Sequence, residues 1–160
     1  MDPAQWIAAF RLTHEQAKRG GLDENEKKKY LSMRDELARS LINAQGLTVP
    51  EKVRPGRAFR VAQVFPIEIN NITRTMTRDL SCMGFTCTVA GSFKEGEQIA
   101  FALTLGRNAE PIPGVARVIA APRQSQTATR LSANFEQLDE ERLEKIETAL
   151  FDAALSRFNT

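Results

Sequence analysis

The stretch DLSCMG, residues 79–84, places side chains that can bind a ligand between two segments that alternate like β-strands. Asp79 and Ser81 are two residues apart, so they lie on the same face of an extended chain. Gly84 follows at a position where the backbone must turn or let another group approach closely. The pattern fits either a bend in which Asp79 and Ser81 bond to nearby backbone, or a small polar ligand site.

Arginine side chains precede this stretch. Arg54, Arg57 and Arg60 lead into the first alternating segment, and a guanidinium group can pair with two phosphate oxygens or with O6 and N7 of guanine. Residues 51–130 carry eleven basic and six acidic side chains, a net charge of +5 in a chain whose total is +2. This segment is the part of the chain expected to attract an anion, although a solvated basic face has the same composition.

The sequence contains no arrangement typical of a catalytic site. Its one histidine, His14, lies outside residues 51–130, and no nucleophile there has a general base beside it in the sequence. Cys82 and Cys87 have no histidine nearby to complete a zinc site and are interpreted as small buried residues. We therefore expect a binding protein rather than an enzyme, with no catalytic residues, no metal and no cofactor.

Residues 3–45 are predicted to form two helices. Asp2 can cap the first helix and Asp23 the second, with Glu26 at the position that completes a capping box. Apolar residues then recur at helical spacing in both segments. We interpret residues 1–46 as an N-terminal helical hairpin that packs on the body of the protein, on a second copy of the chain, or on a signalling partner.

Residues 47–57 are predicted to be a linker because they combine two prolines with few apolar side chains. From residue 58 the hydrophobic period changes to two, and short strands separated by turn residues are typical of a small antiparallel barrel. Asp139 can cap a last helix that closes one end of the barrel. Residues 58–160 are therefore expected to form the barrel and C-terminal helix of an α+β protein. The alternating segments are 59–69, 73–78, 86–89, 98–105, 114–121 and 129–135.

The order of these features resembles the PilZ domain, a family of six-stranded barrels that bind the bacterial messenger cyclic di-GMP. The family signature is R-x-x-x-R before the first strand and [DN]-x-S-x-x-G at the end of the second, and DLSCMG matches the second half in full. The resemblance covers residues 54–155. It implies a six-stranded antiparallel barrel with a C-terminal helix, to which the helical hairpin is an N-terminal extension.

The resemblance also implies the roles of the site residues. The arginines bind phosphate or guanine, Asp79 accepts from N1–H and N2–H of guanine, Ser81 donates to a phosphate oxygen, and Gly84 lets the backbone pass close to the ligand. The arginine motif is degenerate, because Gly56 stands four residues before Arg60, where the family has arginine. Arg57 or Arg54 takes its place in this interpretation. The predicted ligand-binding residues are Arg54, Arg57, Arg60, Asp79, Ser81 and Gly84.

The function implied is a receptor that binds cyclic di-GMP and passes the signal to an unidentified protein partner, or to a second copy of the chain through the N-terminal helices. The alternative is a ligand-free PilZ-like adaptor that works through protein contacts alone. Sequence-specific nucleic-acid binding is disfavoured, because aromatic stacking residues are sparse and the chain is nearly neutral. The apolar runs are too short to cross a bilayer and no signal peptide is read, so we expect a cytoplasmic protein without membrane insertion.

Overall fold

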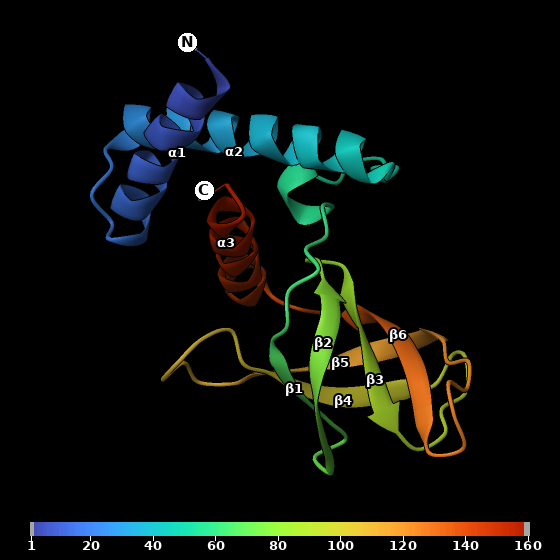
Figure 1. The fold of residues 1–160 in the computed structure, drawn as a ribbon. Coiled ribbons are helices and arrows are strands. Elements are labelled where there is room, and N and C mark those ends of the chain that lie inside the picture. Colours follow the sequence, from blue (N-terminus) through green and yellow to red (C-terminus); the bar gives the residue numbers. More distant parts are fainter. Residues whose placement is uncertain (1, 159–160) are drawn as a thin grey trace. The chain divides into compact units, whose positions relative to one another are not determined.

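The computed structural model describes residues 2–158. The chain divides into two compact units. The helical unit comprises the chain up to Phe59 together with the residues from Asp152 onward, and the barrel unit comprises Arg60–Phe151. Figure 1 shows the helices and the strands of these units, and the predicted α+β class is confirmed. The domain boundaries predicted after residues 46 and 57 stay predictions.

Two helices begin the helical unit, α1 (Pro3–Lys18) and α2 (Glu24–Gln45). Each starts with a capping box. The carboxylate of Asp2 accepts from the backbone N–H of Gln5 at 2.8 Å, and that of Asp23 accepts from the N–H of Glu26 at 2.8 Å. Gly46, in the left-handed conformation, ends α2. The predicted N-terminal helices are confirmed, and Figure 1 shows that their axes cross.

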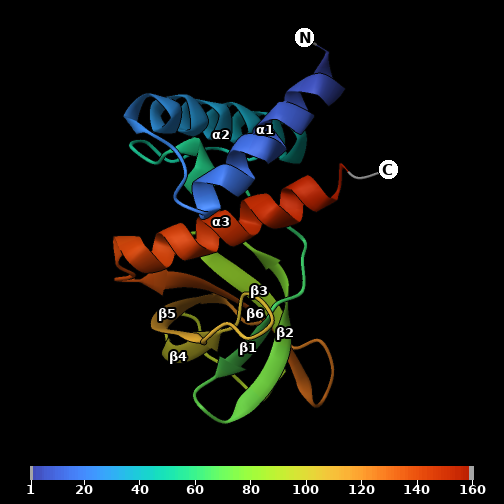
Figure 2. The ribbon, with the colours of Figure 1, turned by 90° about the vertical axis from the view of Figure 1, so that its left-hand side faces the viewer.

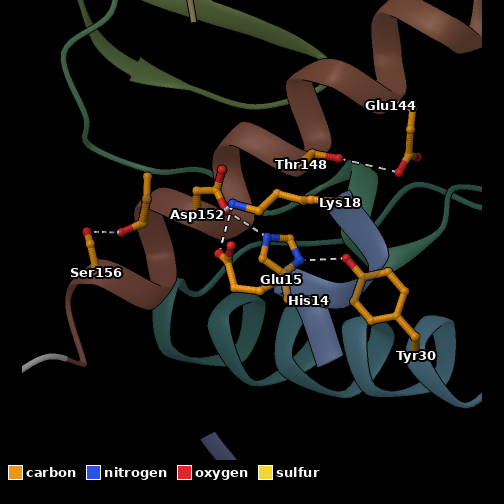
Figure 3. A network of polar contacts seen from close by, with 9 residues as sticks. His14, Glu15, Lys18, Tyr30, Glu144, Thr148, Asp152 and Ser156 are labelled. Atoms are coloured by element: carbon orange, nitrogen blue, oxygen red, sulfur yellow. Dashed lines mark hydrogen bonds and ion pairs between the residues drawn. The ribbon is translucent and has the colours of Figure 1, made fainter. Parts of the chain in front are cut away.

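A buried histidine connects side chains of three helices in this unit (Figure 3). Nδ1 of His14 lies 2.6 Å from the hydroxyl oxygen of Tyr30 on α2, and Nε2 lies 2.8 Å from a carboxylate oxygen of Asp152. Asp152 belongs to the last part of α3 (Glu140–Ser156), and Nζ of Lys18 donates to the same oxygen at 3.0 Å. Because His14 is fully buried, these contacts satisfy both ring nitrogens away from water.

Part of the predicted linker has regular structure. Pro55–Arg57 forms a short 3-10 helix, η1, that contacts α2 within the helical unit. Gly56 is buried there, Arg57 is half-buried and Arg54 is exposed. The residue that departs from the family signature therefore lies in a packed turn.

The six strands of the barrel unit form a closed barrel in the order β1-β2-β3-β6-β5-β4, with each neighbouring pair antiparallel. The turn predicted at Asn70–Asn71 joins β1 to β2, and both residues have the positive φ, 54° and 60°, that such a tight turn needs. The predicted six-stranded antiparallel barrel is confirmed. The strands are β1 (Pro66–Ile69), β2 (Thr73–Leu80), β3 (Gly84–Ala90), β4 (Gln98–Leu103), β5 (Ile112–Ala120) and β6 (Ala128–Glu136).

The first strand is shorter than the predicted segment 59–69, because β1 begins at Pro66. Before β1, the side chain of Thr77 forms hydrogen bonds with backbone groups that would otherwise pair with the backbone of a neighbouring strand. Its hydroxyl accepts from the N–H of Phe65 at 2.9 Å and donates to the carbonyl of Gln63 at 2.8 Å. The prediction of one continuous strand was wrong, because alternation does not reveal a side chain that bonds to the backbone.

Apolar side chains fill the barrel, and α3 lies across one of its ends (Figure 2). The rings of Phe85, Phe101 and Phe135 pack with centroids 4.9 to 6.0 Å apart. Asp139 caps α3 by accepting from the N–H of Arg142 at 2.9 Å. The predicted C-terminal helix is confirmed.

Two strands approach each other closely at Gly84. This residue begins β3 and pairs with Asn134 of β6. A Cβ atom added to Gly84 would lie 2.1 Å from the carbonyl oxygen of Ala133, and the crowding atoms belong to the β6 backbone. A backbone carbonyl cannot rotate away as a flexible side chain can, so any larger residue forces the strands apart.

We expect Gly84→Ala to lower the free energy of unfolding by about 2 kcal/mol, in the range typical of overpacked cores. Urea denaturation followed by circular dichroism measures this change. Gly106→Ala is the matched control, because a Cβ added there meets no heavy atom within 4 Å. Equal stability of the two variants would contradict the packing role of Gly84.

The histidine network predicts a pH-dependent contribution to stability. Burial by itself raises the pKa of Asp152, but the hydrogen bonds and positive charges of His14 and Lys18 outweigh burial, so this pKa lies below its usual value. The contribution of Asp152 to the free energy of unfolding is complete above its unfolded-state pKa of about 3.9. It is lost as the pH falls through the lower folded-state pKa.

We therefore expect Asp152→Asn to lower the free energy of unfolding at neutral pH, and its deficit relative to the parent chain to shrink below roughly pH 4. Urea titrations across this pH range measure the deficit. Asp35→Asn on α2 is the control, because the side chain of Asp35 takes part in no hydrogen bond or ion pair among the described residues. An Asp152→Asn deficit that stays constant down to pH 2 would contradict the assignment.

Candidate ligand-binding site

Four polar side chains form a connected cluster in the barrel unit. Nε of Arg60 donates to Oδ1 of Asp79 at 2.9 Å, Nη2 donates to the same oxygen, and Nη1 donates to Oγ of Ser81 at 3.3 Å. The hydroxyl of Thr86 donates to Oδ2 of Asp79 at 2.8 Å. The side chains of Arg60 and Asp79 are 32% and 31% exposed, so solvent reaches the ion pair.

Two backbone contacts of β2 position this cluster. Val61 and Leu80 exchange a pair of backbone hydrogen bonds, each 2.9 Å long, which holds the neighbouring Arg60 beside Asp79. On the other side of β2, the pairing with β3 shifts register between residues 77 and 79. This β-bulge sets Asp79 opposite Thr86. The acidic side chain is therefore held between a basic partner and a hydroxyl partner.

Ser81 takes part in a local turn as well as in the cluster. Its backbone N–H donates to the carbonyl of Gly84 at 2.9 Å, and its Oγ accepts from the N–H of Met83 at 3.0 Å. The bend that the sequence allowed is thus present, and Ser81 also belongs to the polar cluster. The ligand site, the other alternative, stays a prediction. Because Oγ is the acceptor in its contacts with Met83 and Arg60, its own proton can still be donated.

Gly84 allows the close approach that the sequence pattern predicted, and the group that approaches it is the backbone of β6. Its Cα faces the β6 backbone at a distance that excludes a side chain. Gly84 is also buried. Its predicted role in letting the backbone approach a ligand stays a prediction.

The structure brings together three of the predicted site residues, Arg60, Asp79 and Ser81. Arg54 and Arg57 belong to the helical unit, and their participation in the site stays a prediction. Thr86 was missed by the sequence analysis. The alternation of residues 86–89 places Thr86 on a strand, but its contact with Asp79 depends on the register between β2 and β3.

The described residues hold no group of three or more histidine, cysteine, aspartate or glutamate side chains arranged to bind a metal ion. Burial raises the pKa of the Cys87 thiol to about 12, which keeps this side chain protonated and unreactive at neutral pH. Of the helices in the described part of the chain, none is long and apolar enough to cross a membrane.

Comparisons with known proteins give similarity at the level of structure. No family model matches the chain, and a search of curated proteins finds no significant match. The inhibitor of motility MotI/DgrA from Bacillus subtilis is similar at 16% identity with a TM-score of 0.55, over 61% of this chain and 50% of that chain. The PilZ domain of YcgR from Escherichia coli, solved with cyclic di-GMP, is similar at 16% identity with a TM-score of 0.51, over 62% of this chain and 91% of that chain.

An identity of 16% establishes similarity of fold alone. The chain spans half the length of MotI and nearly the whole of the YcgR domain. Its closed six-stranded barrel and C-terminal helix are those that the sequence resemblance implied. The barrel of this chain therefore has the fold of a PilZ domain.

Proposed function

We propose that this chain is a non-enzymatic receptor that binds cyclic di-GMP and passes the signal to a partner protein. The observation that carries the proposal is the cluster of Arg60, Asp79 and Ser81, which joins residues from both halves of the signature. The PilZ-domain fold supports it, because the similar YcgR domain was solved with cyclic di-GMP. The proposed site comprises Arg60, Asp79, Ser81 and Gly84, with Arg54 and Arg57 as additional ligand-binding arginines.

The chemistry of Asp79 suits recognition of guanine. A carboxylate has about four positions at which it can accept hydrogen bonds, and Arg60 occupies two on Oδ1 while Thr86 occupies one on Oδ2. Bidentate acceptance from N1–H and N2–H of guanine needs one position on each oxygen. Ligand binding therefore requires Arg60 to release Oδ1, and the freed guanidinium can then pair with a phosphate or with the guanine O6/N7 edge.

Signal output is assigned to the N-terminal helices. Leu12 on α1 and Leu31 on α2 are 65% and 42% exposed, which gives these helices apolar side chains for contact with an unidentified protein or with a second copy of the chain.

A ligand-free adaptor is the second candidate function, and one observation favours it. Arg60 and Asp79 satisfy each other within the barrel unit, and the arginine expected at position 56 is a buried glycine. In an adaptor, this cluster would serve as a structural link between the chain before β1 and the end of β2.

We expect Arg60→Ala and Asp79→Ala each to weaken binding of cyclic di-GMP by roughly 1–3 kcal/mol, because each removes a charge-assisted or bidentate contact. Isothermal titration calorimetry of the full chain measures this loss. Asp79→Ala is also expected to reduce the preference for cyclic di-GMP over cyclic di-AMP, since adenine lacks the N1–H and N2–H donors that a carboxylate reads.

Arg74→Ala is the matched control for charge. Arg74 lies on β2 and pairs with Glu68 at 3.2 Å. The substitution therefore removes an ion pair of the barrel that lies outside the proposed site. Thermal unfolding of each variant tests whether the fold is retained. An absence of binding heat for the parent chain at micromolar protein and excess cyclic di-GMP would exclude the receptor and favour the adaptor.

The degenerate arginine motif gives a separate prediction. If one of the two remaining arginines replaces the one missing at Gly56, then either Arg54→Ala or Arg57→Ala will weaken binding by about as much as Arg60→Ala, roughly 1–3 kcal/mol. The other will behave like Arg74→Ala. Calorimetry that finds both variants equal to the parent chain would remove Arg54 and Arg57 from the site.

A further inference from the structure

The outer surface of β2, β3 and β6 continues the polar cluster across three strands. Asp79 pairs with Thr86, and Thr86 pairs with Ser132 on β6. Directly paired residues point to the same side of a sheet, so these three side chains form one row. All three are half-buried, whereas their neighbours Leu80, Phe85 and Leu131 are buried in the barrel.

The bulge in β2 adds an arginine to this row. Arg78 is the extra residue between Thr77 and Asp79, where the register shifts. Thr77 and Leu80 are buried, whereas Arg78 is exposed and Asp79 is half-buried. Residues 78 and 79 therefore both face outward, which regular alternation does not allow.

A second arginine approaches the row from β6. Arg130 precedes Ser132 by two residues and pairs with Thr88, so it faces outward as Ser132 does. It is the diagonal neighbour of Thr86, a position within reach of a long side chain. Arg130 is exposed.

These two arginines differ from the other strand arginines of the barrel in their partners. Arg74 pairs with Glu68, and Arg117 pairs with Glu136. Neither Arg78 nor Arg130 takes part in a side-chain hydrogen bond or ion pair among the residues that the structure describes. Since Arg60 already offsets the charge of Asp79, Arg78 and Arg130 leave two uncompensated positive charges beside the cluster.

We propose that Arg78 and Arg130 bind the two phosphate groups of the cyclic dinucleotide, so that the ligand lies across β2, β3 and β6. This inference rests on the proposed function and adds binding residues that lie outside the sequence signature. Each phosphodiester carries one negative charge, so the ligand matches the charge that these two arginines leave uncompensated. Asp79 faces the same surface and is positioned to read a guanine.

The test is calorimetric titration of the full chain with cyclic di-GMP at several salt concentrations. Arg78→Gln and Arg130→Gln are each expected to weaken binding roughly tenfold, as loss of a charged hydrogen bond does. The double variant is expected to lose more than either single variant, and each is expected to flatten the dependence of affinity on salt. Arg74→Gln and Arg107→Gln remove the same charge elsewhere on the barrel and are expected to stay within about twofold of the parent chain.

The outcomes separate this inference from the proposed function. A parent chain that binds no cyclic di-GMP overturns both. A parent chain that binds, with Arg78→Gln and Arg130→Gln unchanged or no weaker than the two control variants, overturns the phosphate assignment and leaves the receptor intact. If a glutamine variant does not fold, Arg78→Met and Arg130→Met remove the same charge while keeping a long side chain. Parent-like affinity in both also overturns the assignment.

Discussion

The ion pair between Arg60 and Asp79 links the segment that precedes β1 to the end of β2. The bridge between Val61 and Leu80 brings the two backbones together, and the side chains then fix the orientation of the carboxylate. Because about a third of each side chain is exposed, water screens the pair, and its contribution to stability is on the order of 1 kcal/mol or less. The pair therefore orients Asp79 without making its separation from Arg60 costly.

The two groups of this ion pair, a guanidinium and a carboxylate, are each able to form hydrogen bonds with a guanine nucleotide. A ligand that offered phosphate oxygens or the guanine O6/N7 edge to Arg60, and guanine N–H groups to Asp79, would replace the hydrogen bonds of both side chains in the same step. A simple anion would bond only to Arg60 and would leave Oδ1 of Asp79 without the hydrogen-bond donors that Arg60 now supplies. The geometry thus favours a ligand that carries both groups, and the second oxygen of Asp79 can keep its bond from Thr86 during the exchange.

Features with a local cause were predictable from the sequence, and those that depend on pairing between strands were not. The capping boxes of α1 and α2 and the turn at Asn70–Asn71 follow from residues a few positions apart. The contact between Asp79 and Thr86 depends on a bulge whose position is set by β3, and a period of two does not encode it. Likewise, the bonds of Thr77 that shorten the first strand, and the carbonyl that crowds Gly84, come from segments distant in the sequence.

Pairing within the fold also changes what the composition indicates about charge. Residues 51–130 have a net charge of +5, which by itself suggests a basic surface without a defined centre. Carboxylates hold Arg60, Arg74 and Arg117. Arg78 and Arg130, by contrast, have no side-chain hydrogen bond or ion pair among the described residues, and they share one face of the sheet. An approaching anion is drawn toward that face, because uncompensated charges dominate the field near them. The bulge that sets Asp79 beside Thr86 also turns Arg78 to the same face. A single irregularity in β2 thus places a carboxylate and a guanidinium side by side on one face of the sheet.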